Sequence, residues 1–315
     1  MGKLYFIINP KAGNGNGRRV WQTVEKELQT LNQSYSSFFS EYRGHAKELA
    51  DSLIGEEDHL FIVVIGGDGT LNEVINSIAN NQNVRLGFIP GGSGNDFSRG
   101  FRIPREPIQA LHSLLGGINS EAQQVDVGYI LNEGEEKIFF INNMGAGFDA
   151  LICKDVEASM IKKFLNRVSL GNLVYVFILL KRLFTYQCYD LQLTIDGKVH
   201  HFQSTWFVTI ANQPYFGGGM KIAPQALTSD GILNITVVHN LSKLKLLLVF
   251  ISVFWGGHVS FKEVHNFLGK NISIHTSSPA LMHVDGEPIG ETPANIEVSH
   301  KAISLIRNSK ISRQA

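Results

Sequence analysis

Apolar residues follow two different rhythms in the first third of the chain. Three short runs, KLYFIINP (3–10), HLFIVVIGG (59–67) and VRLGFIPGG (84–92), are rich in β-branched and aromatic residues and end in Gly or Pro, which predicts strands buried on both faces. Between them, residues 18–31 and 71–78 repeat apolar side chains every three or four positions, as amphipathic helices do. This alternation predicts a Rossmann-like, three-layer α/β domain with a parallel sheet, whose ligands gather beyond the carboxyl ends of the strands.

The pattern changes near residue 125, where strand-like segments with few helical spacers take over. Several alternate apolar and polar residues, and IDGK (195–198) and VDGE (284–287) carry the Asp-Gly signal of a hairpin turn. We therefore expect an α/β domain over 1–124 and a largely antiparallel, sandwich-like β-rich domain over 125–299, while the tail, about 300–315, is free to pack back on the first domain. The strand-like segments are 124–130, 137–145, 189–196, 202–212, 231–239, 271–276 and 295–300.

Two further segments, 172–184 and 246–255, are strongly apolar. Each is shorter than the roughly 20 residues that a membrane-spanning helix needs, and Lys181 and Arg182 interrupt the first. Core helices inserted into the second domain are the favoured interpretation, ahead of helices that lie in a membrane interface.

Composition narrows the class of protein. The 315 residues are 43% apolar, which is enough for two cores, and 28 basic residues balance 28 acidic ones. A neutral chain lacks the positive field that attracts nucleic acid, so no nucleic-acid partner is expected. Cys153 and Cys188 cannot form a disulfide framework, and the first residues move straight into a strand pattern, so we expect a cytoplasmic protein.

The stretch VVIGGDGTLNEV places Asp68 among glycines where a strand turns into a helix. Glycines permit positive φ and a close approach of a ligand to the backbone, and TLNE predicts a capping box with Thr70 at the N-cap and Glu73 three residues later. The free N–H groups of such a helix start suit phosphate. A carboxylate beside phosphate needs a cation between them, and Mg²⁺ accepts oxygen from both. The alternative is that Asp68 only stabilises a tight turn.

Two more glycine-rich turns, INPKAGNGNGRR (8–19) and IPGGSGNDF (89–97), leave predicted strands at the same edge. Together the three turns predict a nucleotide–Mg²⁺ site. The known fingerprints are absent: the third glycine of G-x-G-x-x-G falls at Asn72, no G-x-x-x-x-G-K-[ST] occurs, and GGSGN departs from G-x-S-x-G at Asn95. Dinucleotide oxidoreductases, Walker-type NTPases and serine hydrolases are therefore disfavoured.

At these residues the sequence resembles the diacylglycerol kinase catalytic-domain family, in particular its soluble bacterial lipid kinases. The matching elements, in the family's order over nearly the whole chain, are NPKAG, GGDGTLNEV, PGGSGNDFSR, VDVG, GAGFDA, GGGMKIAPQALTSDGIL and VDGE. The resemblance implies a two-domain kinase that binds ATP and Mg²⁺ in the cleft between its domains. It would transfer the γ-phosphate to a lipid hydroxyl, and diacylglycerol is the favoured acceptor. The alternatives are an NAD kinase, which shares the glycine–aspartate turn, and a non-catalytic nucleotide- or lipid-binding protein on this fold.

The same resemblance implies the site residues. Asp68 would orient the phosphates and the catalytic Mg²⁺, and Glu287 would act as the general base that takes the proton of the acceptor alcohol. From the residues alone, a solvated side chain after a hairpin turn is the favoured interpretation of Glu287. The implied ATP-binding residues are Asn9, Pro10, Lys11, Ala12, Gly13, Ser40, Gly66, Gly67, Asp68, Gly69, Thr70, Leu71, Asn72 and Ser93.

A second, structural Mg²⁺ is implied in ALTSDGILNI, ligated by the side chain of Asp230 and the carbonyls of Leu227 and Ile232. A plain Asp-Gly turn is the alternative for this loop. The resemblance also allows Asp126 to join the same network. Asp149 either belongs to the site or caps a helix.

A lipid acceptor implies transient contact with the inner face of the membrane, through a basic and apolar rim on the enzyme. From the residues alone, an ordinary solvated face is the favoured interpretation of these charges. The sequence leaves the oligomeric state open, with a homodimer through an exposed strand edge of the second domain as one alternative. The candidates for the rim are Lys162, Lys163, Phe164, Arg167, Arg18 and Arg19.

Overall fold

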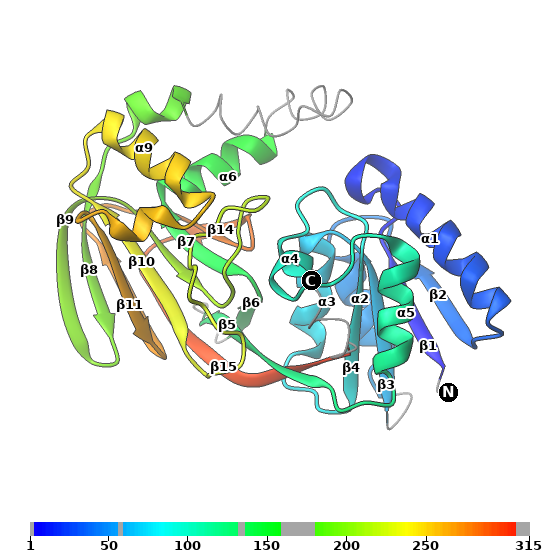
Figure 1. The fold of residues 1–315 in the computed structure, drawn as a ribbon. Helices are drawn as coiled ribbons and strands as arrows, with labels where there is room; N and C mark the ends of the chain where they lie inside the picture. The colour runs from blue at the N-terminus through cyan, green and yellow to red at the C-terminus, as the bar shows by residue number, and fades with distance from the viewer. Residues whose placement is uncertain (1–2, 56–58, 132–135, 159–179, 307–315) are drawn as a thin grey trace. The chain divides into compact units, whose positions relative to one another are not determined.

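The computed structural model describes residues 3–55, 59–131, 136–158 and 180–306 (Figure 1). The chain divides into two compact units. The first contains the residues up to Val127, the short loop Thr228–Gly231 and the segment that starts at Ser299. The second contains Gly128–Leu227 and Ile232–Val298. Strands β5 (Gln123–Leu131) and β15 (Ala294–Leu305) run from one unit into the other.

The first unit is built on a parallel sheet. Its strands are β1 (Leu4–Ile8), β2 (Tyr35–Phe39), β3 (Leu60–Gly66) and β4 (Val84–Pro90), in the order β2-β1-β3-β4. The end of β15 adds a fifth strand, since Ser304 and Leu305 pair in parallel with β4. All of β1 and nearly all of β3 and β4 are buried, which confirms the predicted strands with two covered faces.

Helices cover both faces of this sheet (Figure 1). Helices α1 (Ala12–Thr30) and α5 (Pro107–Gly117) pack on one face through a core that includes Phe6, Trp21 and Leu111. Helices α2 (His45–Leu53) and α3 (Asp68–Ile78) pack together behind it. The predicted three-layer α/β class is therefore confirmed.

The local predictions for this unit were partly wrong. Strand β2 and helix α2 were missed, because β2 is half-buried and its sequence, YSSFF, has neither alternation nor a β-branched run. The capping box at Thr70 was also wrong. Helix α3 begins at Asp68, with Gly67 as its N-cap, so Thr70 lies inside the first turn. The Glu73 carboxylate accepts a hydrogen bond from the Ala46 N–H of α2 (3.1 Å) and does not close a box.

The second unit is an antiparallel β-sandwich, as predicted. One run of strands has the order β14-β13-β7-β9-β8-β12-β15, and β10 and β11 extend from β9 on its other side. Strand β9 changes partners along its length. Its first part, Lys198 to Thr205, pairs with β8, and its last part, Phe207 to Ala211, pairs with β7 and β10. The segment 137–145 forms two strands, not one. The strands are β6 (Lys137–Phe140), β7 (Asn143–Gly147), β8 (Tyr189–Ile195), β9 (Lys198–Ala211), β10 (Leu233–His239), β11 (Val264–Gly269), β12 (Asn271–Thr276), β13 (Leu281–Val284) and β14 (Glu287–Glu291).

Helices α6 (Phe148–Ala158) and α9 (Lys243–Val253), a helical turn over residues 180–185 and the 3₁₀ helix η2 (Gly257–Ser260) lie against this sandwich. The core-helix interpretation holds for only one side of α9. Leu246 and Val249 are buried against Trp206 and Val238, whereas Leu244 and Leu248 are exposed. Of the other apolar segment, residues 172–179 lie outside the described residues. Within the described part of the chain, no helix has the length and apolar character required to cross a bilayer.

Candidate functional site

Three glycine-rich turns of the first unit follow the carboxyl ends of β1, β3 and β4. The N–H groups of Gly91 and Gly92 donate to the Gly66 carbonyl oxygen (2.7 and 3.0 Å). A Cβ on Gly92 would lie 2.5 Å from the Gly67 Cα, and a Cβ on Gly13 would lie 2.5 Å from the Gly91 carbonyl oxygen. The turns therefore pack backbone against backbone, which only glycine allows at these positions.

Side chains predicted for the nucleotide site link the same turns. The Asn9 amide donates to the Thr70 hydroxyl (2.9 Å), and its oxygen accepts from the Lys11 N–H (3.0 Å). Ser40 directly follows β2, and its N–H donates to the Ile8 carbonyl oxygen (2.8 Å). The structure thus gathers residues from three separate loops at one edge of the sheet, where Rossmann-like sheets bind their ligands.

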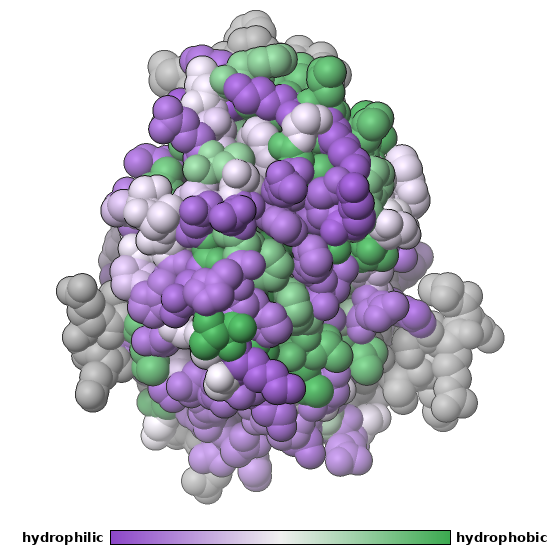
Figure 2. All heavy atoms as spheres, turned by 90° about the vertical axis from the view of Figure 1, so that its left-hand side faces the viewer, coloured by the Kyte–Doolittle hydropathy of each residue, from purple (hydrophilic) through white to green (hydrophobic). Residues whose placement is uncertain are grey.

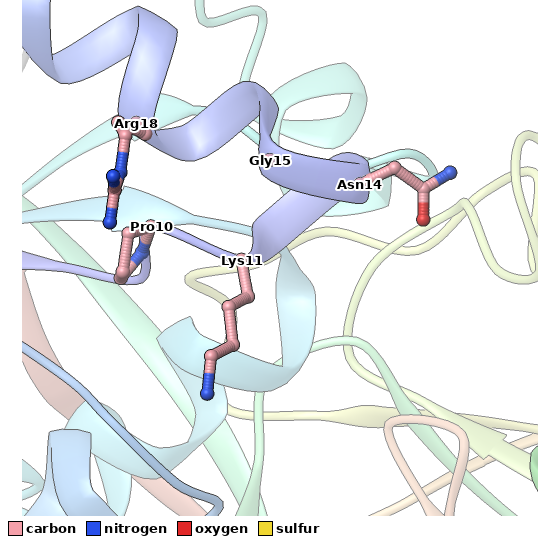
Figure 3. Close-up of a pocket in the computed structure, with 5 residues that line it drawn as sticks. All are labelled: Pro10, Lys11, Asn14, Gly15 and Arg18. Atoms are coloured by element: carbon pink, nitrogen blue, oxygen red, sulfur yellow. The ribbon is translucent and has the colours of Figure 1, made fainter. Parts of the chain in front are cut away.

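A cavity of about 420 Å³ opens beside the first turn and is lined by Pro10, Lys11, Asn14, Gly15 and Arg18 (Figure 3). The side chains of Lys11 and Arg18 lie on either side of Pro10, while Asn14 points away from them. Asn14 and Gly15 adopt left-handed backbone conformations (φ 57° and 87°), which open the start of α1. Two cations beside a turn with exposed backbone suit an anionic ligand. From the sequence, Arg18 was only a candidate for a membrane rim, although its proximity to the glycine turn was a usable signal.

Asp68 connects the second turn to the third. Its two carboxylate oxygens accept the N–H groups of Asp96 (3.1 Å) and Phe97 (3.0 Å), at the start of the short helix α4 (Asp96–Gly100). Burial raises the pKa of Asp68, against the backbone N–H groups of Phe97 and Asp96 and the charge of Arg99, which lower it. Each oxygen keeps a lone pair beyond these bonds. A turn-stabilising role and a cation-facing role are therefore compatible in this one carboxylate.

Asp126 fastens the loop that contains Asp230. It is fully buried, its N–H donates to the Thr228 carbonyl oxygen (2.8 Å), and its carboxylate accepts from the Gly231 N–H (2.6 Å) and the Lys301 N–H (2.7 Å). His300 Nδ1 lies 2.8 Å from the same carboxylate. These bonds explain why Thr228–Gly231, within the range expected for the second domain, belongs to the first unit.

The predicted structural magnesium loop has one acidic side chain, Asp230, which is exposed. Asp230 belongs to the first unit, and Leu227 and Ile232 belong to the second. Among the described residues, no group of three His, Cys, Asp or Glu side chains is arranged to hold a metal ion. One carboxylate with carbonyl oxygens and water remains a donor set that suits Mg²⁺ and does not suit a transition metal.

In the second unit, Glu287 is the first residue of β14 and follows the two-residue turn at Asp285 and Gly286 (φ 47° and 89°). This confirms the Asp-Gly turn expected from VDGE. The Asp285 carboxylate accepts three backbone N–H groups, from residues 141, 142 and 143 (3.0, 2.9 and 3.0 Å). Asp285 was not predicted as a site residue from the sequence, because the turn signal already accounted for an aspartate there.

A buried histidine supports the same turn. His283 Nδ1 accepts the Gly286 N–H (3.2 Å), so its Nε2 carries the ring proton and lies 3.5 Å from Asp149 Oδ2. Asp149 also accepts from the Thr209 hydroxyl (3.1 Å), and the Phe216 ring stacks on His283 at 5.1 Å. Asp149 lies in the first turn of α6, where its other oxygen accepts the Ala150 N–H (2.8 Å). These contacts fix the backbone next to Glu287 from a second side.

Comparison with protein families matches the two parts of the chain separately. The model described as "Diacylglycerol kinase catalytic domain" matches residues 3–130. The model described as "YegS C-terminal NAD kinase beta sandwich-like domain" matches residues 142–307. Their order and lengths follow the α/β and sandwich architecture described above.

Whole-chain relatives agree with these matches. A Bacillus subtilis protein named "Putative lipid kinase YtlR" is 33% identical over 97% of this chain and 99% of its own length. A Mycobacterium tuberculosis protein named diacylglycerol kinase is 26% identical over 98% of this chain and 96% of its own. A crystal structure of a diacylglycerol kinase from Bacillus anthracis superposes with a TM-score of 0.74, at 24% identity and 98% coverage of each chain, and therefore has the same fold.

Proposed function

Because the chain belongs to the diacylglycerol kinase catalytic-domain family of lipid kinases, we propose that it transfers the γ-phosphate of Mg²⁺–ATP to the hydroxyl of diacylglycerol. The observation that carries the proposal is the close packing of the three glycine-rich turns, with the Asp68 carboxylate hydrogen-bonded between the second turn and the third. The bonds from Asp96 and Phe97 to Asp68 and from Asn9 to Thr70 hold these turns in one arrangement.

Within this proposal, the first unit binds the nucleotide. Mg²⁺–ATP supplies an activated phosphoryl group whose negative charge must be neutralised during transfer. Lys11 and Arg18 line the cavity beside the first turn and attract the phosphates. Burial makes the charged form of Asp68 costly, and a cation held at its free lone pairs offsets this cost.

Glu287 is proposed as the general base. An alcohol becomes a competent nucleophile when a positioned carboxylate accepts its proton, and this contribution is typically 10²- to 10⁴-fold in rate. Asp285 and His283 are proposed as positioning residues, because they hold both sides of the turn that precedes Glu287. Asp230, with the carbonyls of Leu227 and Ile232, is proposed to hold a second Mg²⁺ that braces its loop.

A substrate panel tests the reaction. The full chain is incubated with labelled ATP and mixed micelles that contain diacylglycerol, sphingosine, ceramide, undecaprenol or phosphatidylglycerol. NAD is included as a soluble acceptor, because the family model of the second unit is described as similar to the β-sandwich of NAD kinase. We expect Mg²⁺-dependent label in phosphatidic acid. Label in NADP, or in no acceptor while Mg²⁺–ATP still binds, would contradict the proposal.

Variants then test the roles of the two acidic residues. Glu287→Ala is expected to lower kcat by ~10²-fold or more while the thermal shift produced by Mg²⁺–ATP is unchanged. Asp68→Asn is expected to lower both kcat and that thermal shift. Glu291→Ala is the matched control, since Glu291 is exposed at the other end of the same strand. Full activity of Glu287→Ala would remove this residue from the mechanism.

A further inference from the structure

Helix α9 presents an apolar face to solvent. Leu244, Leu248 and Ile251 recur at intervals of four and three residues, and Trp255 follows in the turn after the helix; 73%, 61%, 54% and 65% of these side chains are exposed. Phe254 is 53% exposed beside them. We call these five residues the α9 patch. A single exposed leucine is ordinary, but a stripe at helical spacing marks a surface that meets an apolar partner.

The buried side of the same helix shows that the patch is not needed to attach α9 to its own unit. Leu246, Val249 and Val253 face the interior and are at most 5% exposed. The hydroxyl of Ser242 accepts the Lys245 N–H (3.3 Å) and caps the helix. Figure 2 shows apolar surface near the top of this unit, the end at which Figure 1 places α9, among polar side chains.

Phe184 extends the patch. It is 63% exposed, and Lys243 joins it to α9, since the Lys243 ammonium donates to the Phe184 carbonyl oxygen (2.7 Å) and lies 5.9 Å from the ring. The apolar surface thus continues from α9 to a neighbouring helical turn.

Basic residues predominate around the α9 patch. Segments 180–188 and 241–262 contain no Asp or Glu, although the whole chain has equal numbers of acidic and basic residues. Two acidic residues outside these segments pair with them: Glu263, which is buried, pairs with Lys245 (2.6 Å), and Asp155 of α6 pairs with Arg182 (2.8 Å). Lys181, Lys243 and Lys262 form no ion pair with an acidic residue of the described chain that would cancel their charge. A second copy of this surface would bring like charges together, whereas an anionic bilayer attracts them. The basic residues of the two segments are Lys181, Arg182, Lys243, Lys245 and Lys262.

We propose that the α9 patch docks on the surface of an anionic lipid bilayer. The choice of a bilayer rests on the proposed function, since a lipid acceptor must be taken from one. Helix α9 has 11 residues, too few to cross a hydrocarbon core of about 30 Å, so it lies in the plane of the membrane with its apolar face between headgroups and chains. Trp255 then lies at the depth that tryptophan prefers.

Two sequence-based interpretations change with this docking surface. The interfacial role, set second to a core role, applies to the outer face of α9. Of the rim residues predicted earlier, Lys162, Lys163, Phe164 and Arg167 lie outside the described residues, and Arg18 lines the cavity of the first unit.

Tryptophan fluorescence tests the docking directly. The chain has three tryptophans; Trp21 and Trp206 are 4% and 2% exposed, so an environment change on docking reports Trp255. Vesicles of phosphatidylcholine with about 30 mol% phosphatidylglycerol are added without nucleotide. We expect a shift of emission to shorter wavelength and quenching by brominated acyl chains, both weaker with phosphatidylcholine alone. Trp255→Phe should remove the signal while the protein still sediments with vesicles.

The triple variant Leu244→Ser, Leu248→Ser, Ile251→Ser should lower vesicle affinity at least 10-fold while its unfolding temperature is unchanged, since all three side chains are exposed. The control is the double variant Val199→Thr, Leu268→Thr, which removes apolar side chains of similar exposure (53% and 62%) from strands β9 and β11. It should bind vesicles as the parent does. Unaltered binding of the triple variant, or Trp255 emission shielded from acrylamide before vesicles are added, would overturn the proposal. The latter result would show that the chain itself or a second copy covers the patch. If the parent chain bound vesicles but phosphorylated no lipid, the proposed function would fail while the docking proposal would stand.

Discussion

At the scale of single residues, Gly17 shows how tightly the first glycine turn is closed. A Cβ built on Gly17 overlaps the carbonyl oxygen of Asn9, which is backbone and cannot rotate away. Overpacking of this kind costs about 1–3 kcal/mol, against about 1 kcal/mol that alanine gains over glycine in a helix interior. We therefore expect Gly17→Ala to lower the free energy of unfolding in urea. It should also weaken Mg²⁺–ATP binding, because Asn9 must move away from Thr70.

The control for this prediction is Gln22→Ala, which places an alanine at an exposed position of the same helix and should leave stability within about 0.5 kcal/mol. A stabilised Gly17→Ala variant would show that the turn relaxes without cost and that its close packing is not essential.

Cys188 provides a pH-dependent reporter of the second unit. Burial raises the pKa of its thiol to about 11, against the charge of Lys243, which lowers it. Because only the thiolate reacts, about one thiol in a thousand is reactive near pH 8. In a Cys153→Ser background, we expect alkylation in the folded state to accelerate roughly tenfold per pH unit from about pH 8 to 10. The rate in urea should level off near the ordinary thiol pKa.

The raised pKa of Cys188 also has a consequence for stability. The folded state binds the thiol proton more tightly than the unfolded chain, whose thiol pKa is 9.0. The protonated thiol therefore contributes its full stabilisation below pH 9, and this contribution is lost as the pH rises towards the folded-state pKa of about 11. Equal alkylation rates of folded and unfolded protein near pH 8 would contradict the burial of this thiol.

At the scale of elements, Asp126 decides where the loop Thr228–Gly231 lies. Asparagine in its place would point an amide N–H₂ at either the Gly231 or the Lys301 N–H, both of which now donate to the carboxylate. An unmatched buried donor and the loss of charge-assisted bonds cost about 2–4 kcal/mol together. We expect Asp126→Asn to lower the urea midpoint and to speed amide exchange at Gly231 and Lys301.

His300→Gln is the matched control, because the His300 side chain is 47% exposed and its replacement leaves both backbone N–H groups bonded to the Asp126 carboxylate. If the two variants proved equally stable, the carboxylate of Asp126 would not be what holds the loop.

Elements with a strong local pattern were predictable from the sequence, and those held by tertiary contacts were not. The buried runs of β1, β3 and β4 and the turns at Asp196 and Asp285 followed their sequence signals. The Thr70 capping box failed because Glu73 has a better partner in Ala46, far away in sequence. Likewise, the apolar run of α9 contains both its buried and its exposed face, and composition alone cannot separate them.

The candidate site shows the same division. The glycine turns and Asp68 were found from their sequence context, since their backbone requirements are local. Asp285 and Arg18 were not assigned to the site, because their roles depend on the N–H groups of residues 141–143 and on the fold of the first turn.

At the scale of the whole molecule, acidic and basic residues are equal in number but unevenly distributed, because the two segments around the α9 patch contain only basic ones. The chain has no net charge, so long-range attraction to an anionic membrane is weak. Attraction at short range, within a Debye length of about 8–10 Å, depends on the basic residues around the α9 patch. In the proposed docking, apolar insertion then supplies most of the binding free energy. The enzyme is therefore expected to require contact with the bilayer surface before transfer.

Interfacial kinetics follow from that order of events. With diacylglycerol in anionic vesicles, the rate should depend on its mole fraction in the surface, and vesicles without diacylglycerol should inhibit by dilution. The triple variant of the α9 patch should lose at least ~10-fold in rate on vesicles, because even partial insertion of three apolar side chains, each worth about 1.5–3 kcal/mol when fully buried, exceeds 1.4 kcal/mol. With a short-chain diacylglycerol dispersed below its micelle concentration, the same variant should keep the parent kcat, because its substitutions leave Asp68, Lys11 and Glu287 in place. If the triple variant lost the same factor in rate on dispersed and on vesicular substrate, the α9 patch would affect the chemical step or folding. Its role in docking would then be contradicted.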